Sequence, residues 1–265
     1  MLVDTHCHLY LPDFDQDREN VIRKAFESGV TKILIPGIDV LTSGQAIKLC
    51  SRFPKSLFAA VGIHPNSMIS YDDKIINQIK SLAHFDCVVA IGEIGLDYYR
   101  EKTSRSQQLD LFLTQLEIAS DLSLPVCIHN READQDICFY IKKWVNDLKL
   151  RNSPISNNPG VMHSFTGSLE LALEFIQMGF YLGIGGPITY KKNQILRDFL
   201  PTLPLKNILL ETDSPYLPPQ PFRGQRNEPL HLNLIAKTIA YCYKDKIENI
   251  AEITSLNSKN CFHWK

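Results

Sequence analysis

The sequence lacks the cysteine patterns that hold small secreted proteins and zinc modules together. Its seven cysteines are odd in number and scattered, and no two of them are spaced as C-x-x-C. This pattern disfavours both a disulfide framework and a structural zinc knuckle. A chain of 265 residues also buries enough surface to fold without a covalent staple. We therefore expect a protein of a reducing compartment, the cytoplasm.

Long apolar runs and an excess of either charge are missing as well. No uninterrupted apolar segment approaches the roughly 18 residues of a membrane span, and residues 1–6 lack the basic and apolar regions of a secretory signal. The formal net charge is −1, which cannot provide the broad basic surface of a protein that grips long duplex DNA. We expect no membrane association, and any contact with nucleic acid must be local.

What the sequence does contain is a regular alternation of short β-rich apolar runs and longer amphipathic segments. The expected strands cover residues 3–6, 32–35, 58–62, 88–92, 125–128, 160–162, 180–184 and 208–210. Expected helices include 15–28, 105–122, 133–149 and 168–178, and two more near the end, 230–241 and 247–260. Eight strands alternating with helices predict one α/β domain over residues 1–265, a (β/α)8 TIM-type barrel.

Two segments interrupt this alternation, and two glycines mark its boundaries. Residues 151–159 are polar and rich in turn-forming residues, which predicts a surface loop. Residues 214–230 contain five prolines, which exclude a regular helix and favour an extended, ordered loop. Gly29 and Gly179 directly follow two of the expected helices, where a glycine commonly ends a helix.

The first expected strand ends in two histidines that stand two residues apart, in the stretch DTHCH. Side chains alternate across a strand, so His6 and His8 point the same way and can reach one metal ion together. Such a pair alone does not distinguish metal ligands from packed or solvated histidines. Its interpretation depends on what lies at the ends of the other strands.

Four further residues of ligand type occupy equivalent places along the chain. Glu93 follows the fourth expected strand, His129 the fifth, His163 the sixth and Asp213 the eighth. The carboxyl ends of the strands carry the active site in essentially every characterised barrel enzyme. Six separately satisfied polar residues would be the alternative, but their convergence on one face predicts a metal centre.

Six metal ligands are too many for one ion with an open catalytic position, but they suit two divalent ions that share a carboxylate. We expect Glu93 to be that bridge. The ligands of the first ion would then be His6, His8 and Asp213, and those of the second His129 and His163. Two ions so held can activate a water molecule and stabilise both oxygens of a phosphodiester displacement.

Seven motifs make the chain resemble the TatD-like metal-dependent hydrolases, often called TatD-type deoxyribonucleases. They are DTHCHL (4–9), GIHP (62–65), IGEIGLDYYR (91–100), IHNRE (128–132), HSFTGS (163–168), LLETDSPYL (209–217) and RGQRNEP (223–229). The resemblance covers essentially the whole chain in order and implies a barrel of the metal-dependent hydrolase kind. It also implies the same six metal ligands and a 3′ to 5′ exonuclease that acts on DNA with magnesium.

The resemblance and the ligand chemistry disagree about the metal. Four histidines form a softer set than magnesium prefers and favour zinc, manganese or iron. We expect two divalent ions per subunit (Mg, Mn or Zn) and leave their identity open. One departure from some relatives is Asn66 after the GIHP motif, where they carry a second histidine.

Two other functions remain open on the sequence alone. The same activated water attacks a carbonyl carbon, so an ester or amide hydrolase such as a D-aminoacyl-tRNA deacylase is the alternative to a deoxyribonuclease. A metal-bound scaffold without activity is disfavoured because no ligand is missing. The expected partner is therefore nucleic acid, namely DNA or the ends of RNA or tRNA, and we expect the protein to be a monomer.

Several residues beyond the six ligands are candidates for catalysis or substrate binding. Asp213 is either a pure ligand or also the base that accepts a proton from the attacking water. Glu211 lies two residues earlier on the same strand face, where it would support a ligand or point into the barrel. His64 would contact a substrate phosphate or simply pack.

Arginines and tyrosines near the strand ends add candidates for substrate contacts. Arg131 follows His129 with strand alternation, and Arg226 lies in the proline-rich loop with Arg223; each would clamp a phosphate or remain a solvated surface residue. Tyr98 and Tyr99 would offer faces for base stacking, although packing is the more common role for at least one of them.

Overall fold

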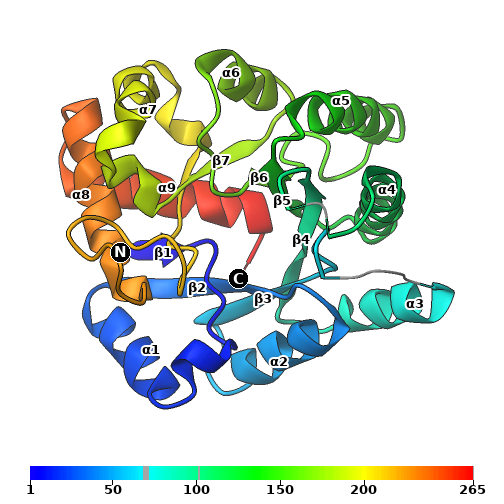
Figure 1. Cartoon of the computed structure of the whole chain (residues 1–265), viewed down its shortest axis with the longest axis horizontal. Coiled ribbons are helices and arrows are strands. Elements are labelled where there is room, and N and C mark those ends of the chain that lie inside the picture. Colours follow the sequence, from blue (N-terminus) through cyan, green and yellow to red (C-terminus); the bar gives the residue numbers. More distant parts are fainter. Residues whose placement is uncertain (68–71, 101, 265) are drawn as a thin grey trace.

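The computed structural model describes residues 1–67, 72–100 and 102–264. In this part of the chain, eight parallel strands pair in their sequence order and form a nearly closed barrel (Figure 1). The strands are β1 (Leu2–Asp4), β2 (Val30–Pro36), β3 (Leu57–Val61), β4 (Val88–Asp97), β5 (Val126–Arg131), β6 (Gly160–Met162), β7 (Tyr181–Ile184) and β8 (Ile208–Leu210). The predicted TIM-type barrel is confirmed.

The helices surround the barrel (Figure 1). They are α1 (Arg18–Glu27), α2 (Val40–Cys50), α3 (Asp73–Leu82), α4 (Arg105–Leu122), α5 (Asp134–Leu150), α6 (Leu169–Gln177), α7 (Gln194–Phe199), α8 (Leu232–Tyr243) and α9 (Ile247–Phe262). The 3-10 turns are η1 (Pro12–Phe14), η2 (Gly186–Thr189), η3 (Lys191–Asn193), η4 (Leu200–Thr202), η5 (Leu205–Asn207) and η6 (Pro229–His231). None of the helices in the described part of the chain is long and apolar enough to span a membrane.

Local signals set many of the helix boundaries. The side chains that cap helices α2, α3, α4 and α6 are Asp39, Asp72, Ser104 and Ser168. Each accepts a hydrogen bond from the backbone N–H three residues later, which satisfies a donor that the helix itself leaves free. Gly29 and Gly179 follow the ends of α1 and α6 with φ of +94° and +89°, a conformation that glycine adopts without strain.

The first and last strands meet beyond their carboxyl ends. Thr5 donates its backbone N–H (3.0 Å) and its hydroxyl (2.9 Å) to the carbonyl oxygen of Leu210. The N–H of Asp213 donates to the carbonyl oxygen of His6 at 2.8 Å. These bonds bring His6 and Asp213 side by side although they lie at opposite ends of the chain.

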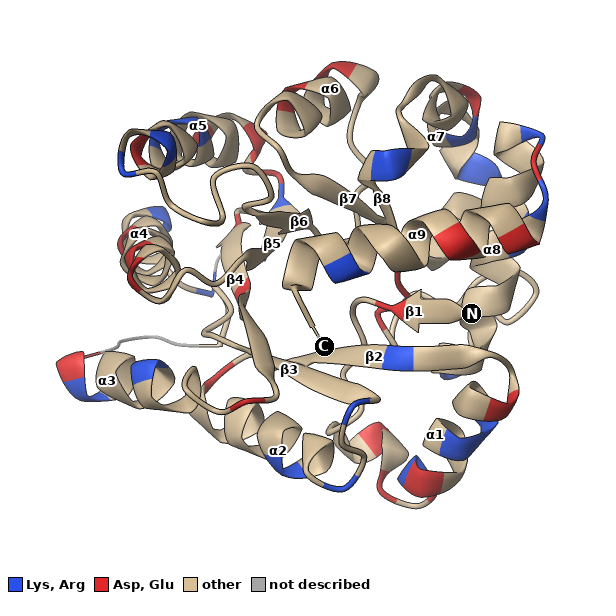
Figure 2. Ribbon diagram, turned by 180° about the vertical axis from the view of Figure 1, so that it is seen from behind, with Lys and Arg blue, Asp and Glu red and all other residues tan. Residues whose placement is uncertain are grey.

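The barrel interior is a core of its own, separate from the apolar layer between strands and helices. Its members come from all eight strands: Val3, Leu34, Phe58, Ala60, Val89, Ala90, Cys127, Val161, Tyr181 and Leu209. Cys261, Phe262 and Trp264, from the end of α9 and the residues after it, complete this cluster. Seen from the opposite side, α9 crosses the barrel (Figure 2).

Hydrogen bonds show which end of the barrel α9 covers. The hydroxyl of Ser255 donates to the carbonyl oxygen of Met1, and the side-chain amide of Asn257 donates to that of Ile208. Met1 and Ile208 lie where β1 and β8 begin, so α9 closes the amino-terminal end of the barrel. A site on the axis of the barrel therefore has access to solvent only from the carboxyl-terminal end.

Several strand boundaries differ from the sequence-based expectation. β1 ends at Asp4 and not at residue 6, because the chain then leaves the sheet and Cys7 makes only an isolated bridge to Ser214. β4 extends to Asp97 and β5 to Arg131, so Glu93 and His129 lie within their strands. The helix expected from residue 15 begins only at Arg18, because residues 15–17 form a turn after η1.

The position of Phe262 leads to a stability prediction. Its side chain is 2% exposed in the barrel core. We expect Phe262→Ala to lower the free energy of unfolding by about 3–5 kcal/mol, because it removes buried apolar surface and leaves a cavity. Urea denaturation would measure the change. Tyr241→Ala, at an 85% exposed position on α8, is the control and should change stability by less than about 0.5 kcal/mol.

Candidate metal centre

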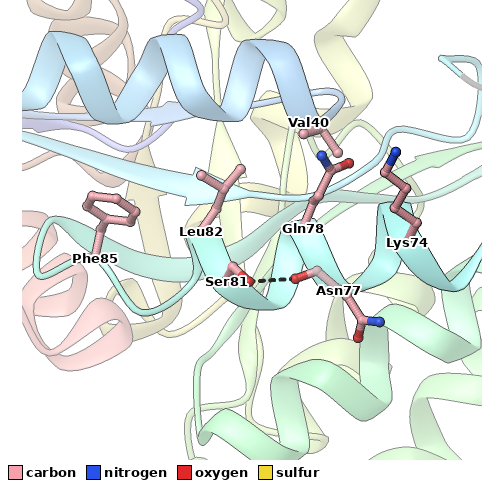
Figure 3. Close-up of a pocket in the computed structure, with 7 residues that line it drawn as sticks. All are labelled: Val40, Lys74, Asn77, Gln78, Ser81, Leu82 and Phe85. Atoms are coloured by element: carbon pink, nitrogen blue, oxygen red, sulfur yellow. Dashed lines mark hydrogen bonds between the residues drawn. The ribbon is translucent and has the colours of Figure 1, made fainter.

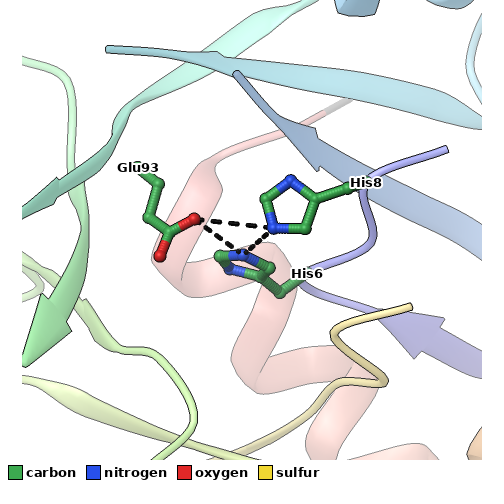
Figure 4. Close-up of side chains that lie close together, drawn as sticks. All are labelled: His6, His8 and Glu93. Carbon is green, nitrogen blue, oxygen red and sulfur yellow. Dashed lines mark hydrogen bonds and ion pairs between the residues drawn. The ribbon is translucent and has the colours of Figure 1, made fainter. Parts of the chain in front are cut away.

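The six predicted ligands converge at the carboxyl ends of the strands, around the carboxylate of Glu93. Its Oε2 atom lies 3.4 Å from Nε2 of His6 and 3.5 Å from Nε2 of His8 (Figure 4). Oδ1 of Asp213 lies 3.8 Å and 3.5 Å from the same two nitrogens. One oxygen of Glu93 thus faces the group that we expected to hold the first ion.

The other carboxylate oxygen of Glu93 faces a second group of histidines. Oε1 lies 3.1 Å from Nδ1 of His129, 3.6 Å from Nε2 of His163 and 3.6 Å from Nε2 of His64. His64, which the sequence suggested only as a phosphate contact, therefore lies within the cluster. In the described part of the chain, the residues that could hold a metal ion form three overlapping groups: His6, His8 and Glu93; His6, His163 and Glu211; His64, Glu93 and His129.

Glu93 reaches this position through an irregularity in β4. The register of its pairing with β5 shifts between Ile91 and Ile94. Both isoleucines pack in the outer core although they lie three positions apart, which regular alternation does not allow. The shift turns Glu93 inward, as local strand irregularities next to active sites often do.

Five histidines of the cluster have a second partner on the ring nitrogen that faces away from it; for His64 this partner is the N–H of Asn66, which donates to Nδ1 at 3.1 Å. Nδ1 of His8 lies 3.0 Å from the hydroxyl of Tyr10 and 3.2 Å from the carbonyl oxygen of Pro36, and its Nε2 faces the carboxylates of Glu93 and Asp213. Nδ1 of His6 lies 3.3 Å from the thiol of Cys127. Metal-binding histidines in proteins are oriented by outer partners of this kind.

His129 and His163 are oriented by carboxylates. Nε2 of His129 lies 3.2 Å from Oδ2 of Asp97, and Nδ1 of His163 lies 3.1 Å from Oε1 of Glu211. In each ring the other nitrogen faces Glu93. Glu211 therefore lies beside a candidate ligand, as one of the two sequence interpretations expected.

Asp97 is a site residue that the sequence analysis did not single out, although it belongs to the IGEIGLDYYR motif. Besides His129, its carboxylate accepts hydrogen bonds from the side-chain amide of Asn66 (2.8 Å) and from the backbone N–H groups of Tyr99 (3.1 Å) and Arg100 (2.9 Å). Asn66, the departure from some relatives, thus contacts the site through Asp97. The sequence signal that could have identified Asp97 was a carboxylate in this motif, shortly after the fourth expected strand.

The buried carboxylate of Glu211 has one oxygen with no protein partner. Oε1 accepts from the N–H of Ser164 at 2.6 Å, whereas Oε2 has no hydrogen bond among the described residues. A Cβ at Gly183 would collide with this carboxylate, so only glycine leaves room for it there. A buried oxygen without a partner is costly unless a cation or water completes it.

Burial and charge oppose each other throughout the cluster. Burial works against ionising Glu93, but the surrounding histidines outweigh it and hold the pKa of its carboxyl well below the usual range. Burial also acts to lower the pKa of His163, but the carboxylate of Glu211 outweighs it and raises that pKa to about 10. Burial lowers the pKa of His64 to about 3. Ionised carboxylates in this setting would be stabilised by cations.

Asp4 lies beneath the cluster and joins the ends of β1 and β8. It accepts hydrogen bonds from the N–H (2.9 Å) and the hydroxyl (2.6 Å) of Thr212. Burial raises the pKa of its carboxyl to about 8. Because His6 and Asp213 immediately follow these strand ends, Asp4 and Thr212 help to position both side chains.

The arginine candidates lie outside the cluster. The guanidinium of Arg226 donates to Asp17 at 2.7 and 2.8 Å and to Glu228 at 2.7 Å. Its hydrogen-bonding capacity is thus largely used within the protein, and its proposed phosphate contact gains no support from this position. Arg131 instead lies over the ring of Tyr99, 3.8 Å from the ring centre. Arg223 lies 4.3 Å from the ring centre of Tyr190.

A hollow on the outer surface between α2 and α3 lies away from the metal-ligand candidates (Figure 3). The residues that line it in the described chain are Val40, Lys74, Asn77, Gln78, Ser81, Leu82 and Phe85. Lys74 is the only ionisable side chain among them, so this hollow lacks the paired acid and base groups of a hydrolytic site.

Comparison with known proteins agrees with this geometry. The family model described as "TatD related DNase" matches residues 3–263. The metal-dependent hydrolase YabD of Bacillus subtilis (strain 168) is 37% identical over 262 residues, which cover 99% of both chains. The 3′-5′ ssDNA/RNA exonuclease TatD of Erwinia tasmaniensis is 34% identical over 267 residues, which cover 99% of this chain and 100% of the relative.

A solved structure extends the similarity to the fold. The TatD homologue YjjV from Escherichia coli K12 matches with a TM-score of 0.89 at 31% sequence identity. The match covers 99% of this chain and 98% of that chain. The resemblance inferred from the seven motifs is confirmed.

The contact between Asp97 and His129 leads to a prediction about metal affinity. We expect Asp97→Asn to weaken divalent-metal binding by about 10- to 100-fold, because a neutral amide orients and polarises the imidazole less well than a carboxylate. Competition with a metal-sensitive dye would measure the affinity. Asp121→Asn, at an exposed position on α4, is the matched control, and equal affinities in the two variants would contradict a role for Asp97.

Proposed function

This chain belongs to the TatD-related DNase family and is a metal-dependent hydrolase, and on that premise we propose that it cleaves phosphodiester bonds at the 3′ ends of nucleic acid. DNA is the first candidate substrate, and RNA or tRNA ends are the next. The observation that carries the proposal is Glu93, a buried carboxylate with one oxygen toward each of two groups of ligand-type side chains.

The residues present fit two divalent ions. His6, His8 and Asp213 would hold the first ion, His129 and His163 the second, and Glu93 would bridge them. His64 lies beside the second group, but its Nδ1 accepts the N–H of Asn66 at 3.1 Å, so its Nε2 carries the ring proton and is a donor. The unpartnered oxygen of Glu211 supports the fit. The imidazole-rich set favours zinc or manganese over magnesium. When bound, such ions lower the pKa of a water and offset charge on the attacking and leaving oxygens.

The protein's own side chains supply the remaining chemistry. Asp213 is the proposed base: its carboxylate lies at the inner end of the β8 loop, and the neighbouring His8 holds the pKa of its carboxyl below the usual range despite burial. An ionised carboxylate can accept the proton that the attacking water loses. Glu211 keeps His163 oriented. His64 is the proposed hydrogen-bonding contact to the scissile phosphate.

The setting of the enzyme is proposed from its thiols and charge. All seven cysteines are free, which supports a reducing compartment such as the cytoplasm. Basic and acidic residues are interspersed over the outer helices (Figure 2), and this suits a short substrate bound locally in the site. Monomeric behaviour remains a prediction that light scattering would test.

The proposed substrate class is tested by assaying the metal-loaded protein on three substrates in parallel. These are single-stranded DNA with a free 3′ end, the matching RNA, and D-aminoacyl-tRNA. Release of mononucleotides from the 3′ end supports the proposal. Deacylation of the tRNA without cleavage of either oligonucleotide would favour the ester-hydrolase alternative.

Metal stoichiometry tests the bridging role of Glu93. Two divalent ions per chain are expected in the wild-type protein after loading with manganese or zinc. Glu93→Gln should lose both, because the same side chain faces both groups, whereas His163→Ala should retain one. Elemental analysis after gel filtration measures both variants. Retention of two ions by Glu93→Gln would contradict the bridged arrangement.

Asp213→Asn tests the proposed base. The substitution keeps the size of the side chain but removes its charge and basicity, so kcat should fall by at least about 10²–10⁴-fold with the fold intact. Circular dichroism and metal analysis at saturating metal control for folding and occupancy. A variant with near-normal kcat and both ions bound would show that Asp213 is not the base.

A further inference from the structure

Two tyrosines at the carboxyl end of the barrel expose their rings to solvent beside the metal-centre candidates. Tyr99 is 59% exposed and Tyr216 is 53% exposed. Each follows a strand that supplies a central residue of the site, since Tyr99 comes after β4 and Tyr216 comes after β8. Isolated exposed aromatic residues are common, but two beside one polar site suggest a ligand with flat apolar faces.

Tyr99 is held next to the histidines on the Oε1 side of Glu93. Its N–H donates to Oδ1 of Asp97, whose other oxygen lies 3.2 Å from Nε2 of His129. The guanidinium of Arg131 lies 3.8 Å from the centre of the Tyr99 ring. The arginine thus braces one face of the ring and places a positive charge beside it. The preceding residue, Tyr98, is only 8% exposed and donates its hydroxyl to Asp136, so it cannot serve in the same way.

Tyr216 is held next to the group on the Oε2 side. Its N–H donates to the carbonyl oxygen of Asp213 at 2.8 Å, and its own carbonyl oxygen accepts from the side-chain amide of Asn227 at 2.8 Å. The Tyr216 ring lies 6.1 Å from that of His8 at an interplanar angle of 68°. A tight turn therefore fixes an exposed ring close to the proposed base.

The two rings and the guanidinium of Arg131 match the chemistry of an unpaired nucleic-acid strand. Every base has a π-face that stacks on an aromatic ring, and phosphates between successive bases pair with arginine. Bases in a duplex already stack on their neighbours and would have to be pulled out first. An apolar peptide would also cover tyrosines, but it offers no anion for Arg131 or for the cations of the site.

We propose that Tyr216 and Tyr99, the latter braced by Arg131, are base-stacking platforms for the two nucleotides that flank the scissile phosphate. The inference rests on the proposed phosphodiesterase function and deepens it.

Base-dependent kinetics test this proposal. Tyr216→Ala and Tyr99→Ala should each raise KM for a single-stranded oligonucleotide by about 5- to 150-fold, the range expected for loss of one base stack. Tyr216→Phe and Tyr99→Phe keep the ring and should restore KM. The control is Tyr241→Ala, because Tyr241 is 85% exposed near the end of α8, at the opposite end of the barrel.

An oligonucleotide with abasic sites at its last two positions separates stacking from a general defect. Wild type and the Tyr→Ala variants should cleave it equally. A loss on this abasic substrate equal to the loss on the normal oligonucleotide, or an unchanged KM on the normal oligonucleotide in both Tyr→Ala variants, overturns the proposal.

Failure of the proposed function has a different signature. If the metal-loaded wild type hydrolyses no phosphodiester at all, that function is wrong, and fluorescence anisotropy with a labelled single-stranded oligonucleotide then decides the stacking question. Weaker binding in the Tyr→Ala variants than in the Tyr→Phe variants supports the platforms. Equal binding, or no binding by the wild type, overturns them.

Discussion

A buried carboxylate that faces imidazoles on both of its oxygens is the constraint on which the site depends. Ionised Glu93 would be expensive to bury alone, and the histidines around it outweigh that cost. Its two sides then divide the cluster into the groups of His6 with His8 and of His129 with His163. The carboxylate oxygens and imidazole nitrogens gathered around Glu93 are the ligand atoms that divalent cations bind.

The barrel supplies what such a cluster needs, namely ligands from distant parts of the chain on one rigid frame. Hydrogen bonds of Thr5 and Asp213 join the first strand to the last, and α9 closes the opposite end of the barrel. The interior below the cluster is filled with apolar side chains, so water reaches the cluster from one side only. The orientation of the His129 and His163 rings is set by their outer partners, Asp97 and Glu211.

Sequence patterns predicted the barrel and the convergence of its candidate ligands because both depend on local rules. Strand and helix periodicities are local, and the carboxyl ends of parallel strands must meet on one face. His129 lies in β5, and His6, His8 and His163 follow within a few residues of a strand end, so the order of the strands brings all four to that face. The glycine helix ends and the proline-rich loop were predicted for the same reason, since each depends on the conformational limits of single residues.

Only the tertiary structure decided which neighbours each of these residues has. Alternation along β4 would not have turned Glu93 inward; a register shift against β5 does so. Asp97 and Asn66 lie in the site because β3 and β4 pair side by side, so that Asn66, in the loop after β3, reaches the end of β4 and donates to Asp97. Arg226 is paired and not a free cation, because Asp17, far away in sequence, lies next to it. The sequence determined the residue types and the face of the barrel on which they lie, whereas pairings between distant segments depend on three-dimensional packing that no local pattern encodes.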